Sequence, residues 1–166
     1  GRYFLEKQQR STGVAERELV RIAVRSLGLD ELSPFNPDER VIEYLLRDPR
    51  DTRLVDMSLA AFTAETAAES AAPGGGSIAA ALGALGAALG TMVANLSSHR
   101  RGWDARWREF SDHADDGQRR VAALLRLVDE DTRAFEAVMN AFGLPKGSDA
   151  EKTARSAAIR DATLAA

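Results

Sequence analysis

The stretch SAAPGGGSIAAALGALGAALG, residues 70–90, decides the fold. A proline and three glycines at residues 73–76 form a chain break, and an uncharged run of alanine, leucine and glycine follows. We expect Ser77 to cap a helix that runs over residues 78–98. The large apolar residues of this segment recur at steps of four and three, which predicts a stripe that packs into a helical bundle: Ile78, Leu82, Leu85, Leu89, Met92 and Leu96.

A second stripe of the same predicted helix is almost bare backbone. Ala79, Gly83, Gly86 and Gly90 also step by four and three. Each glycine costs a helix roughly 1 kcal/mol relative to alanine. Three of them on one face therefore indicate the close approach of another helix or of a flat ligand.

Other interpretations of this stretch are weaker. A phosphate-binding loop needs a lysine before the serine, and none is near Ser77. Residues 78–96 carry no charge and approach the length of a membrane span, with the small-residue spacing of membrane helices. Their alanine and glycine content, with Thr91 and Asn95, instead favours the central helix of a soluble bundle. Free N–H groups at the helix start favour an anion or a carbonyl oxygen, and a tight helix–helix turn is the alternative.

The composition excludes several classes of function. The net charge of −3 favours neither nucleic acid nor an anionic membrane as a partner. The absence of cysteine excludes thiol catalysis and fits a reducing, cytoplasmic location. His99 and His113 are the two histidines, and we interpret both as structural. No metal site is predicted, because no ligand spacing brings them together with carboxylates on an inward face.

The remaining chain shows helical patterns and no alternating strand pattern. Residues 1–47 are predicted as helices and turns, and the polar segment RDPRDTR, broken by Pro49, predicts a linker over residues 48–54. We predict an all-α, up-and-down helical bundle over residues 55–166. Its other helices are expected over residues 58–70, 103–142 and from 149 onward.

A seam of apolar residues runs through the segment 103–142 and should face the bundle interior. Its members are apolar or glycine except Asp131. Neighbouring Asp129 lies off the seam and is interpreted as a surface residue that either pairs with Arg133 or is solvated by water. The seam consists of Trp103, Trp107, Phe110, Ala114, Gly117, Val121, Leu124, Val128, Asp131, Phe135, Val138 and Phe142.

A lone carboxyl in an apolar seam has two interpretations. Burial penalises the ionised form, and a carboxyl that exchanges its proton near neutrality inside a pocket is what general acid–base chemistry requires. Alternatively, Asp131 pairs with an arginine of another helix or caps a helix, and so specifies packing. Both interpretations stay open at this point.

Three motifs together resemble the cyclodeaminase domain of the formiminotransferase-cyclodeaminase family. They are the APGGGS turn, the GALGAALG helix and LVDEDTRAF at residues 127–135. The upstream SLGLDELSPFNPDERVIEYLL resembles the end of the formiminotransferase half of the same bifunctional family. The resemblance implies that residues 1–47 are a mostly helical remnant of an α/β transferase domain. It also implies a cyclodeaminase-like bundle that continues past Ala166.

The resemblance implies an activity and a site. The family's cyclodeaminase converts 5-formiminotetrahydrofolate to 5,10-methenyltetrahydrofolate and ammonia in histidine degradation, and its aspartate maps to Asp131 as a proton-transfer residue. Tetrahydrofolate would enter as the formimino-carrying substrate, with no metal, and helix packing would give a homo-oligomer. The alternatives are a methenyltetrahydrofolate cyclohydrolase on the same fold and a non-catalytic helical oligomerisation module. The expected substrate-binding residues are Gly75, Gly76, Ser77, Gly86 and Asn95.

Overall fold

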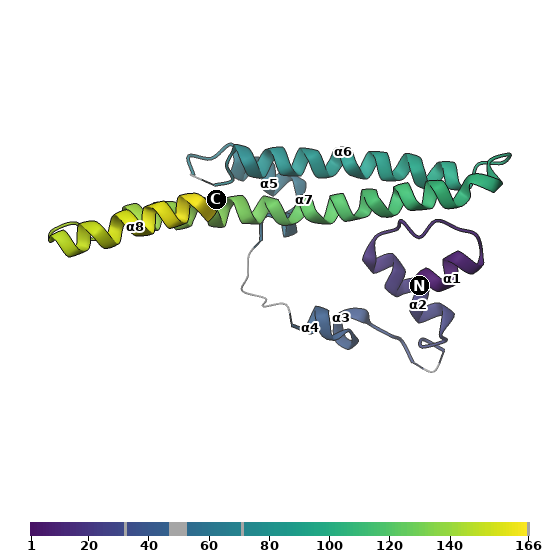
Figure 1. The fold of residues 1–166 in the computed structure, drawn as a ribbon. Helices are drawn as coiled ribbons and strands as arrows, with labels where there is room; N and C mark the ends of the chain where they lie inside the picture. Colours follow the sequence, from purple (N-terminus) through teal and green to yellow (C-terminus); the bar gives the residue numbers. More distant parts are fainter. Residues whose placement is uncertain (32, 47–52, 71, 166) are drawn as a thin grey trace. The chain divides into compact units, whose positions relative to one another are not determined.

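The computed structural model of the chain describes residues 1–31, 33–46, 53–70 and 72–165. Most of the predicted linker, residues 48–54, lies outside these described residues. The described residues form helices and no strand, which confirms the predicted all-α class (Figure 1). The α-helices are α1 (Arg2–Lys7), α2 (Glu16–Ser26), α3 (Pro37–Arg40), α4 (Ile42–Leu45), α5 (Leu59–Thr66), α6 (Gly75–Ser98), α7 (Trp107–Phe142) and α8 (Asp149–Ala165). Two short 3-10 helices are η1 (Leu54–Asp56) and η2 (Asp104–Arg106).

The two long helices, α6 and α7, form an antiparallel pair (Figure 1). Ser77, near the start of α6, bonds to Asp131, far along α7. Thr91, further along α6, lies against Gly117, earlier in α7. Residue numbers therefore rise in one helix as they fall in the other.

The face of α6 that is buried carries small residues rather than leucines. A close helix pair needs small side chains at the contact, because they let the two backbones approach. The predicted packing of the leucine stripe is wrong for this chain, since Leu82, Leu85 and Leu89 are each at least 60% exposed. The buried residues of α6 are Ser77, Ala80, Ala84, Thr91, Ala94 and Ser98.

The seam of α7 is confirmed in its middle and wrong at its C-terminal end. Ala114 and Val128 are buried, at 0% and 2% exposure. Phe135 and Phe142 are exposed. The reason is that Ser77, in the first turn of α6, already faces Asp131, so the last turns of α7 extend past the start of α6 and have no part of it opposite.

The backbone contacts divide the chain into two compact units, and the division cuts across both long helices. One unit contains residues 53–82 and 124–166. Within it, the Ser58 hydroxyl accepts the Ala61 N–H at 3.1 Å and caps α5, as predicted, although α5 ends at Thr66 rather than at residue 70. Helix α8 is tied to the end of α7, because the Arg155 guanidinium donates to the Phe142 carbonyl at 3.2 Å.

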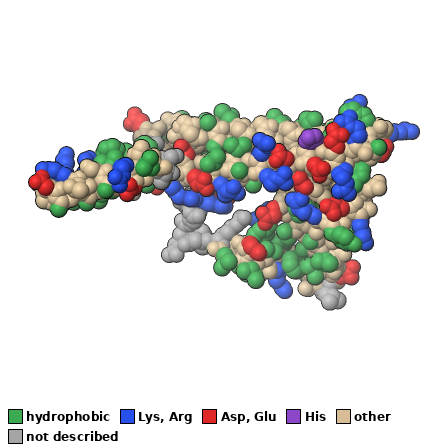
Figure 2. Space-filling model, viewed as in Figure 1, with side chains coloured by type: hydrophobic (Ala, Val, Ile, Leu, Met, Phe, Trp, Pro, Cys, Tyr) green, Lys and Arg blue, Asp and Glu red, His purple; other side chains and the backbone are tan. Residues whose placement is uncertain are grey.

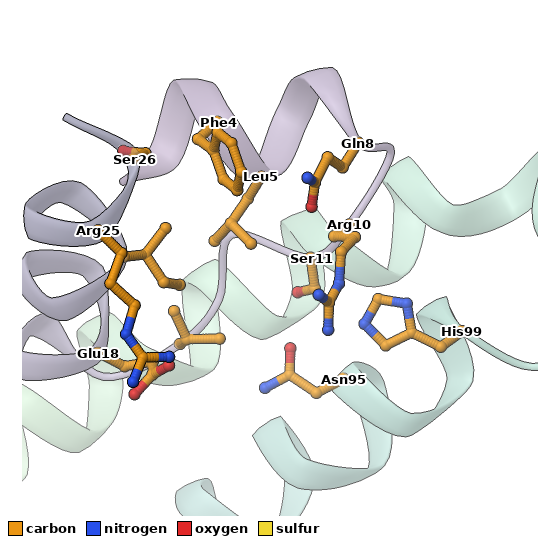
Figure 3. Close-up of a pocket in the computed structure, with 12 residues that line it drawn as sticks. Phe4, Leu5, Gln8, Arg10, Ser11, Glu18, Arg25, Ser26, Asn95 and His99 are labelled. Carbon is orange, nitrogen blue, oxygen red and sulfur yellow. The ribbon is translucent and has the colours of Figure 1, made fainter. Parts of the chain in front are cut away.

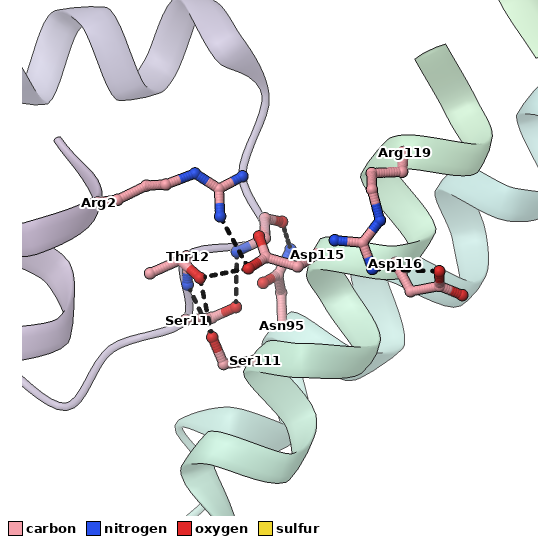
Figure 4. Close-up of polar contacts among 9 residues, drawn as sticks. Arg2, Ser11, Thr12, Asn95, Ser111, Asp115, Asp116 and Arg119 are labelled. Carbon is pink, nitrogen blue, oxygen red and sulfur yellow. Dashed lines mark hydrogen bonds and ion pairs between the residues drawn. The ribbon is translucent and has the colours of Figure 1, made fainter. Parts of the chain in front are cut away.

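The other unit contains residues 1–52 and 83–123. In it, the buried segment Ser11–Gly13 lies directly on the two long helices (Figure 4). The Thr12 N–H donates to Ser111 Oγ at 3.0 Å and its hydroxyl donates to Asp115 at 2.8 Å. A side chain on Gly13 would overlap Ala114, so only glycine allows this close approach.

The surface of α6 is strongly apolar. Figure 2 shows hydrophobic side chains exposed along the α6 part of the molecule. Among the described helices, α6 is long and apolar enough to cross a membrane. Its most apolar stretch has a mean hydropathy of 1.8, and 28% of that stretch is buried. The core helix of a soluble protein meets the same criteria, so the expectation that the chain has no membrane partner stays a prediction.

Candidate functional site

The candidate site lies in the unit of residues 53–82 and 124–166, where Asp131 of α7 meets the first turn of α6. Oδ2 of Asp131 accepts two hydrogen bonds from Ser77. The main-chain N–H of Ser77 donates at 2.8 Å and its hydroxyl at 2.9 Å. Ser77 itself is fully buried, whereas Asp131 is partly exposed.

The start of α6 explains this contact. The first N–H groups of an α-helix have no partner within the helix, and the helix dipole favours a negative group beside them. Here the carboxylate of Asp131, from the other helix, supplies that partner. The prediction that Ser77 caps a helix from residue 78 is therefore wrong: α6 begins at Gly75, and Ser77 lies inside its first turn.

The predicted glycines at the turn have different roles. A side chain on Gly76 would overlap the carboxyl group of Asp131, so its bare Cα leaves the space that the carboxylate occupies. A Cβ on Gly74 would lie at van der Waals distance, 3.4 Å, from Oδ2 of Asp131. Gly75 is exposed, and a Cβ there would meet nothing within 4 Å.

The geometry separates the two oxygens of Asp131. Oδ2 is held by Ser77, and no residue in the described ranges donates to Oδ1. The sequence left two packing roles for Asp131, an ion pair with an arginine or a helix cap. No arginine of the described chain pairs with Asp131, and its carboxylate caps the start of α6. The cap uses one oxygen only, and Oδ1 accepts no hydrogen bond from a described residue.

Three further contacts in the site were not foreseen. The Ser77 hydroxyl also lies 2.8 Å from the Val128 carbonyl oxygen, so its single proton is shared between that oxygen and Oδ2 of Asp131. The Thr132 hydroxyl lies 3.3 Å from the same Ser77 oxygen. Asp129 is buried at 8% exposure, because its Oδ1 accepts the Leu54 N–H of η1 at 2.6 Å. The interpretation of Asp129 as a surface residue is therefore wrong. The position of Asp129 off the seam predicted exposure. Its burial results from the approach of η1, a contact between distant segments that the spacing within one helix does not reveal.

The structure brings Gly76, Ser77 and Asp131 together and leaves Gly86 and Asn95 outside this cluster. A Cβ on Gly86 would meet nothing within 4 Å, so its face of α6 is open in this chain. Asn95 lies in the other compact unit, where its amide Nδ2 donates to the Gly13 carbonyl at 2.8 Å. Both hydrogen-bond donors of Ser77 are used on neighbouring protein atoms, and Ser77 has no exposed surface. The described geometry therefore does not favour a direct hydrogen bond from Ser77 to a ligand.

Metal-ligating groups do not gather at the site. Within the part of the chain that the structure describes, no three His, Cys, Asp or Glu side chains lie together in a way that could hold a metal ion. His99 and His113 are both exposed. The expectation that the protein uses no metal stays a prediction.

The fold and the site define a class of all-helical protein. In this class one long helix begins at a glycine turn, and an aspartate of the antiparallel helix binds a main-chain N–H group of its first turn. The family described as formiminotransferase-cyclodeaminase matches residues 58–166, and the formiminotransferase domain matches residues 1–47. Because the first match covers most of the chain, the chain belongs to the formiminotransferase-cyclodeaminase family.

Several curated proteins are similar to this chain. Formimidoyltransferase-cyclodeaminase of Rattus norvegicus is 44% identical over 88% of this chain and 27% of its own length. The Gallus gallus protein of the same name is 38% identical over 95% of this chain and 29% of its own length. Methenyltetrahydrofolate cyclohydrolase of Methylorubrum extorquens is 38% identical over 63% of this chain and 50% of its own length. The chain thus spans little more than a quarter of the two formimidoyltransferase-cyclodeaminases.

Proposed function

We propose that this chain provides the cyclodeaminase site of a bifunctional enzyme that also carries glutamate formiminotransferase activity in histidine degradation. The site converts 5-formiminotetrahydrofolate to 5,10-methenyltetrahydrofolate and releases ammonia, so the enzyme is an ammonia lyase. The observation that carries the proposal is the aspartate held through one oxygen at the glycine turn. Membership of the family and the formiminotransferase match at residues 1–47 support it.

The reaction needs one proton to change nitrogens. N10 of the folate attacks the protonated formimino carbon, which forms the new N10–C bond and a tetrahedral aminal. The N10 proton must leave, and the exocyclic NH2 must gain a proton before its C–N bond breaks and ammonia departs. The positive charge of the formimino group ends on the methenyl product, so the balance requires no metal, oxidant or added nucleophile. A single carboxyl that takes and returns a proton is sufficient for general acid–base catalysis.

We assign this transfer to Oδ1 of Asp131. An amide N–H can only donate, so the 2.8 Å bond from the Ser77 N–H keeps Oδ2 an acceptor. The proton that moves from N10 to the leaving nitrogen is therefore carried on Oδ1. Ser77 is a positioning residue in this account, because its two bonds fix the carboxyl group without requiring contact with the substrate.

The other expected contacts, partners and location complete the proposal. Gly75 and Gly76 would lie near the carboxylate at the reacting end of tetrahydrofolate. Gly86, which belongs to the other compact unit, stays a separate candidate for contact with the flat folate rings. Asn95 stays a weaker candidate for a folate contact because it already serves Gly13. The exposed leucines of α6 support a homo-oligomer formed by helix packing. The lack of cysteine supports a cytoplasmic location. The net charge of −3 supports the expectation of no nucleic-acid or membrane partner.

A second candidate function is methenyltetrahydrofolate cyclohydrolase, which the similarity to the Methylorubrum extorquens protein favours. The two activities are separated by supplying the full-length protein with 5-formiminotetrahydrofolate and, separately, with 5,10-methenyltetrahydrofolate. We expect methenyl absorbance to rise with stoichiometric ammonia in the first reaction. Loss of methenyl absorbance in the second without turnover in the first would assign the cyclohydrolase. No turnover of either compound by folded protein would favour a non-catalytic oligomerisation module.

A further inference from the structure

A separate cavity of about 540 Å³ lies in the unit of residues 1–52 and 83–123, where α1 and α2 face the end of α6 (Figure 3). Its volume is in the range of small-molecule sites. It shares no lining residue with the Asp131 cluster. The proton transfer proposed for Asp131 therefore gives this cavity no role, and Asn95, the weaker folate candidate, is the one residue that the two proposals share.

One buried acceptor in the cavity wall has no partner. The Gly13 carbonyl can only accept, so the 2.8 Å bond to it fixes Nδ2 of Asn95 toward Gly13 and turns Oδ1 of Asn95 away. This Oδ1 is buried and receives no hydrogen bond from the described chain. A buried polar atom without a partner is costly, so the position favours an N–H or O–H donor from a bound molecule.

The charges of the lining include both signs. Arg10 and Arg25 line the cavity, and neither forms an ion pair with a described residue. Figure 3 shows the guanidinium of Arg10 pointing toward Asn95 and His99. Glu18 supplies a carboxylate whose partner, Arg21 at 2.6 Å, is not among the lining residues.

The lining also contains polar side chains, which are Gln8, Ser11, Ser26 and His99, and an apolar wall formed by Phe4, Leu5, Val14 and Ile22. We propose that this cavity binds a free α-amino acid with an apolar side chain. Arg10 pairs with the carboxylate of the ligand, and Asn95 Oδ1 accepts from its ammonium group, which Glu18 balances. The side chain of the ligand lies against the apolar wall. Each of the three parts of the ligand thus meets a lining group of matching chemistry.

The proposal is tested by titrating the full-length protein with L-leucine in a calorimeter, without folate. We expect saturable binding of one leucine per chain. Leucinamide, which lacks the carboxylate, and 4-methylpentanoate, which lacks the ammonium, should each bind at least about tenfold more weakly, and glycine should not compete. Absence of saturable leucine binding at millimolar concentration, or equal binding of 4-methylpentanoate, overturns the proposal.

Matched variants place the binding in this cavity. Arg10→Gln should weaken leucine binding about tenfold, whereas Arg108→Gln, which removes an exposed arginine outside the cavity, should leave it unchanged. Glu18→Gln should weaken it, whereas Arg21→Gln, which breaks the same Glu18–Arg21 ion pair from the other side, should not. Unchanged folate turnover in these variants would separate the cavity from the cyclodeaminase site. Equal leucine affinity in Arg10→Gln and Arg108→Gln contradicts the assignment.

Discussion

Ser77 holds Oδ2 of Asp131 with two donors, its main-chain N–H at 2.8 Å and its hydroxyl at 2.9 Å. The two residues lie on antiparallel helices, so this contact both closes the start of α6 and orients the carboxyl group. The same contact therefore links the stability of the helix pair to the geometry of the proposed reaction. Substitutions around it can separate these two consequences.

Replacing Ser77 by alanine should lower turnover more than it lowers stability. Ser77→Ala keeps the N–H bond to Asp131 and removes the hydroxyl, which should cost about 1–2 kcal/mol of unfolding free energy and leave the carboxyl less constrained. We expect kcat to fall roughly ten- to a hundredfold. The control is Ser98→Ala, because the buried Ser98 hydroxyl donates to the main-chain carbonyl of Asn95 at 2.8 Å and does not contact Asp131. Equal effects of both variants on kcat would refute the positioning role.

The glycine turn offers a matched pair of substitutions one residue apart. In Gly76→Ala the new methyl group overlaps the Asp131 carboxyl, so either the carboxyl or the turn must shift, and we expect about a hundredfold loss of turnover. Gly75→Ala meets nothing within 4 Å and should change stability by less than about 1 kcal/mol with turnover retained. The measurement is steady-state kinetics with chemical denaturation of each variant. If Gly76→Ala is as active as Gly75→Ala, the close approach of Asp131 is not needed.

Gly117 tests the close packing of α6 and α7 away from the site. A Cβ on Gly117 would overlap the Thr91 hydroxyl, so Gly117→Ala should cost about 1–3 kcal/mol of unfolding free energy. Gly90→Ala, which meets nothing within 4 Å on the open face of α6, should be stabilising by up to about 1 kcal/mol. Thermal or urea unfolding measures both. A stable Gly117→Ala would show that the helices lie further apart than described.

The start of α8 should loosen at acid pH. The N–H of Ser148 and then that of Gly147, each 2.8 Å from Oε2, lower the pKa of Glu151 below its usual value. A depressed carboxyl pKa contributes stability above the unfolded-state value, and that contribution is lost as the pH falls through the folded-state value. The protection of the Gly147 and Ser148 amides from exchange, taken relative to an unfolded chain at the same pH, should therefore fall as the pH drops below about 4.3. In Glu151→Gln this pH dependence should be absent. If the variant and the wild type show the same pH dependence, the Glu151 carboxylate does not hold the start of α8.

Much of this fold was predictable because the relevant information is local. The helical segments and the inward position of Asp131 follow from residue spacing along single helices. The partner of Asp131 was not predictable from spacing, because the group that caps α6 comes from α7, 54 residues away. The burial of Asp129 depends on the approach of Leu54, 75 residues away, for the same reason.

The packing of α6 shows a different limit. The predicted leucine stripe and the predicted stripe of Ala79, Gly83, Gly86 and Gly90 have similar periodicity, and neither of them is the face that meets α7. The structure places Ala80, Ala84 and Thr91 inside, because small side chains allow a closer helix pair than leucines do.

The most direct test of the central claim compares Asp131→Asn with Asp129→Asn in the full-length protein. Turnover of 5-formiminotetrahydrofolate is followed by methenyl absorbance and ammonia release, with circular dichroism as the check on folding. Asparagine keeps an oxygen for the Ser77 donors but cannot exchange the proton, so Asp131→Asn should lower kcat by about a hundredfold or more in folded protein. Asp129→Asn, which changes the cap of η1, should retain most of the activity. A folded Asp131→Asn with the wild-type rate would contradict the account.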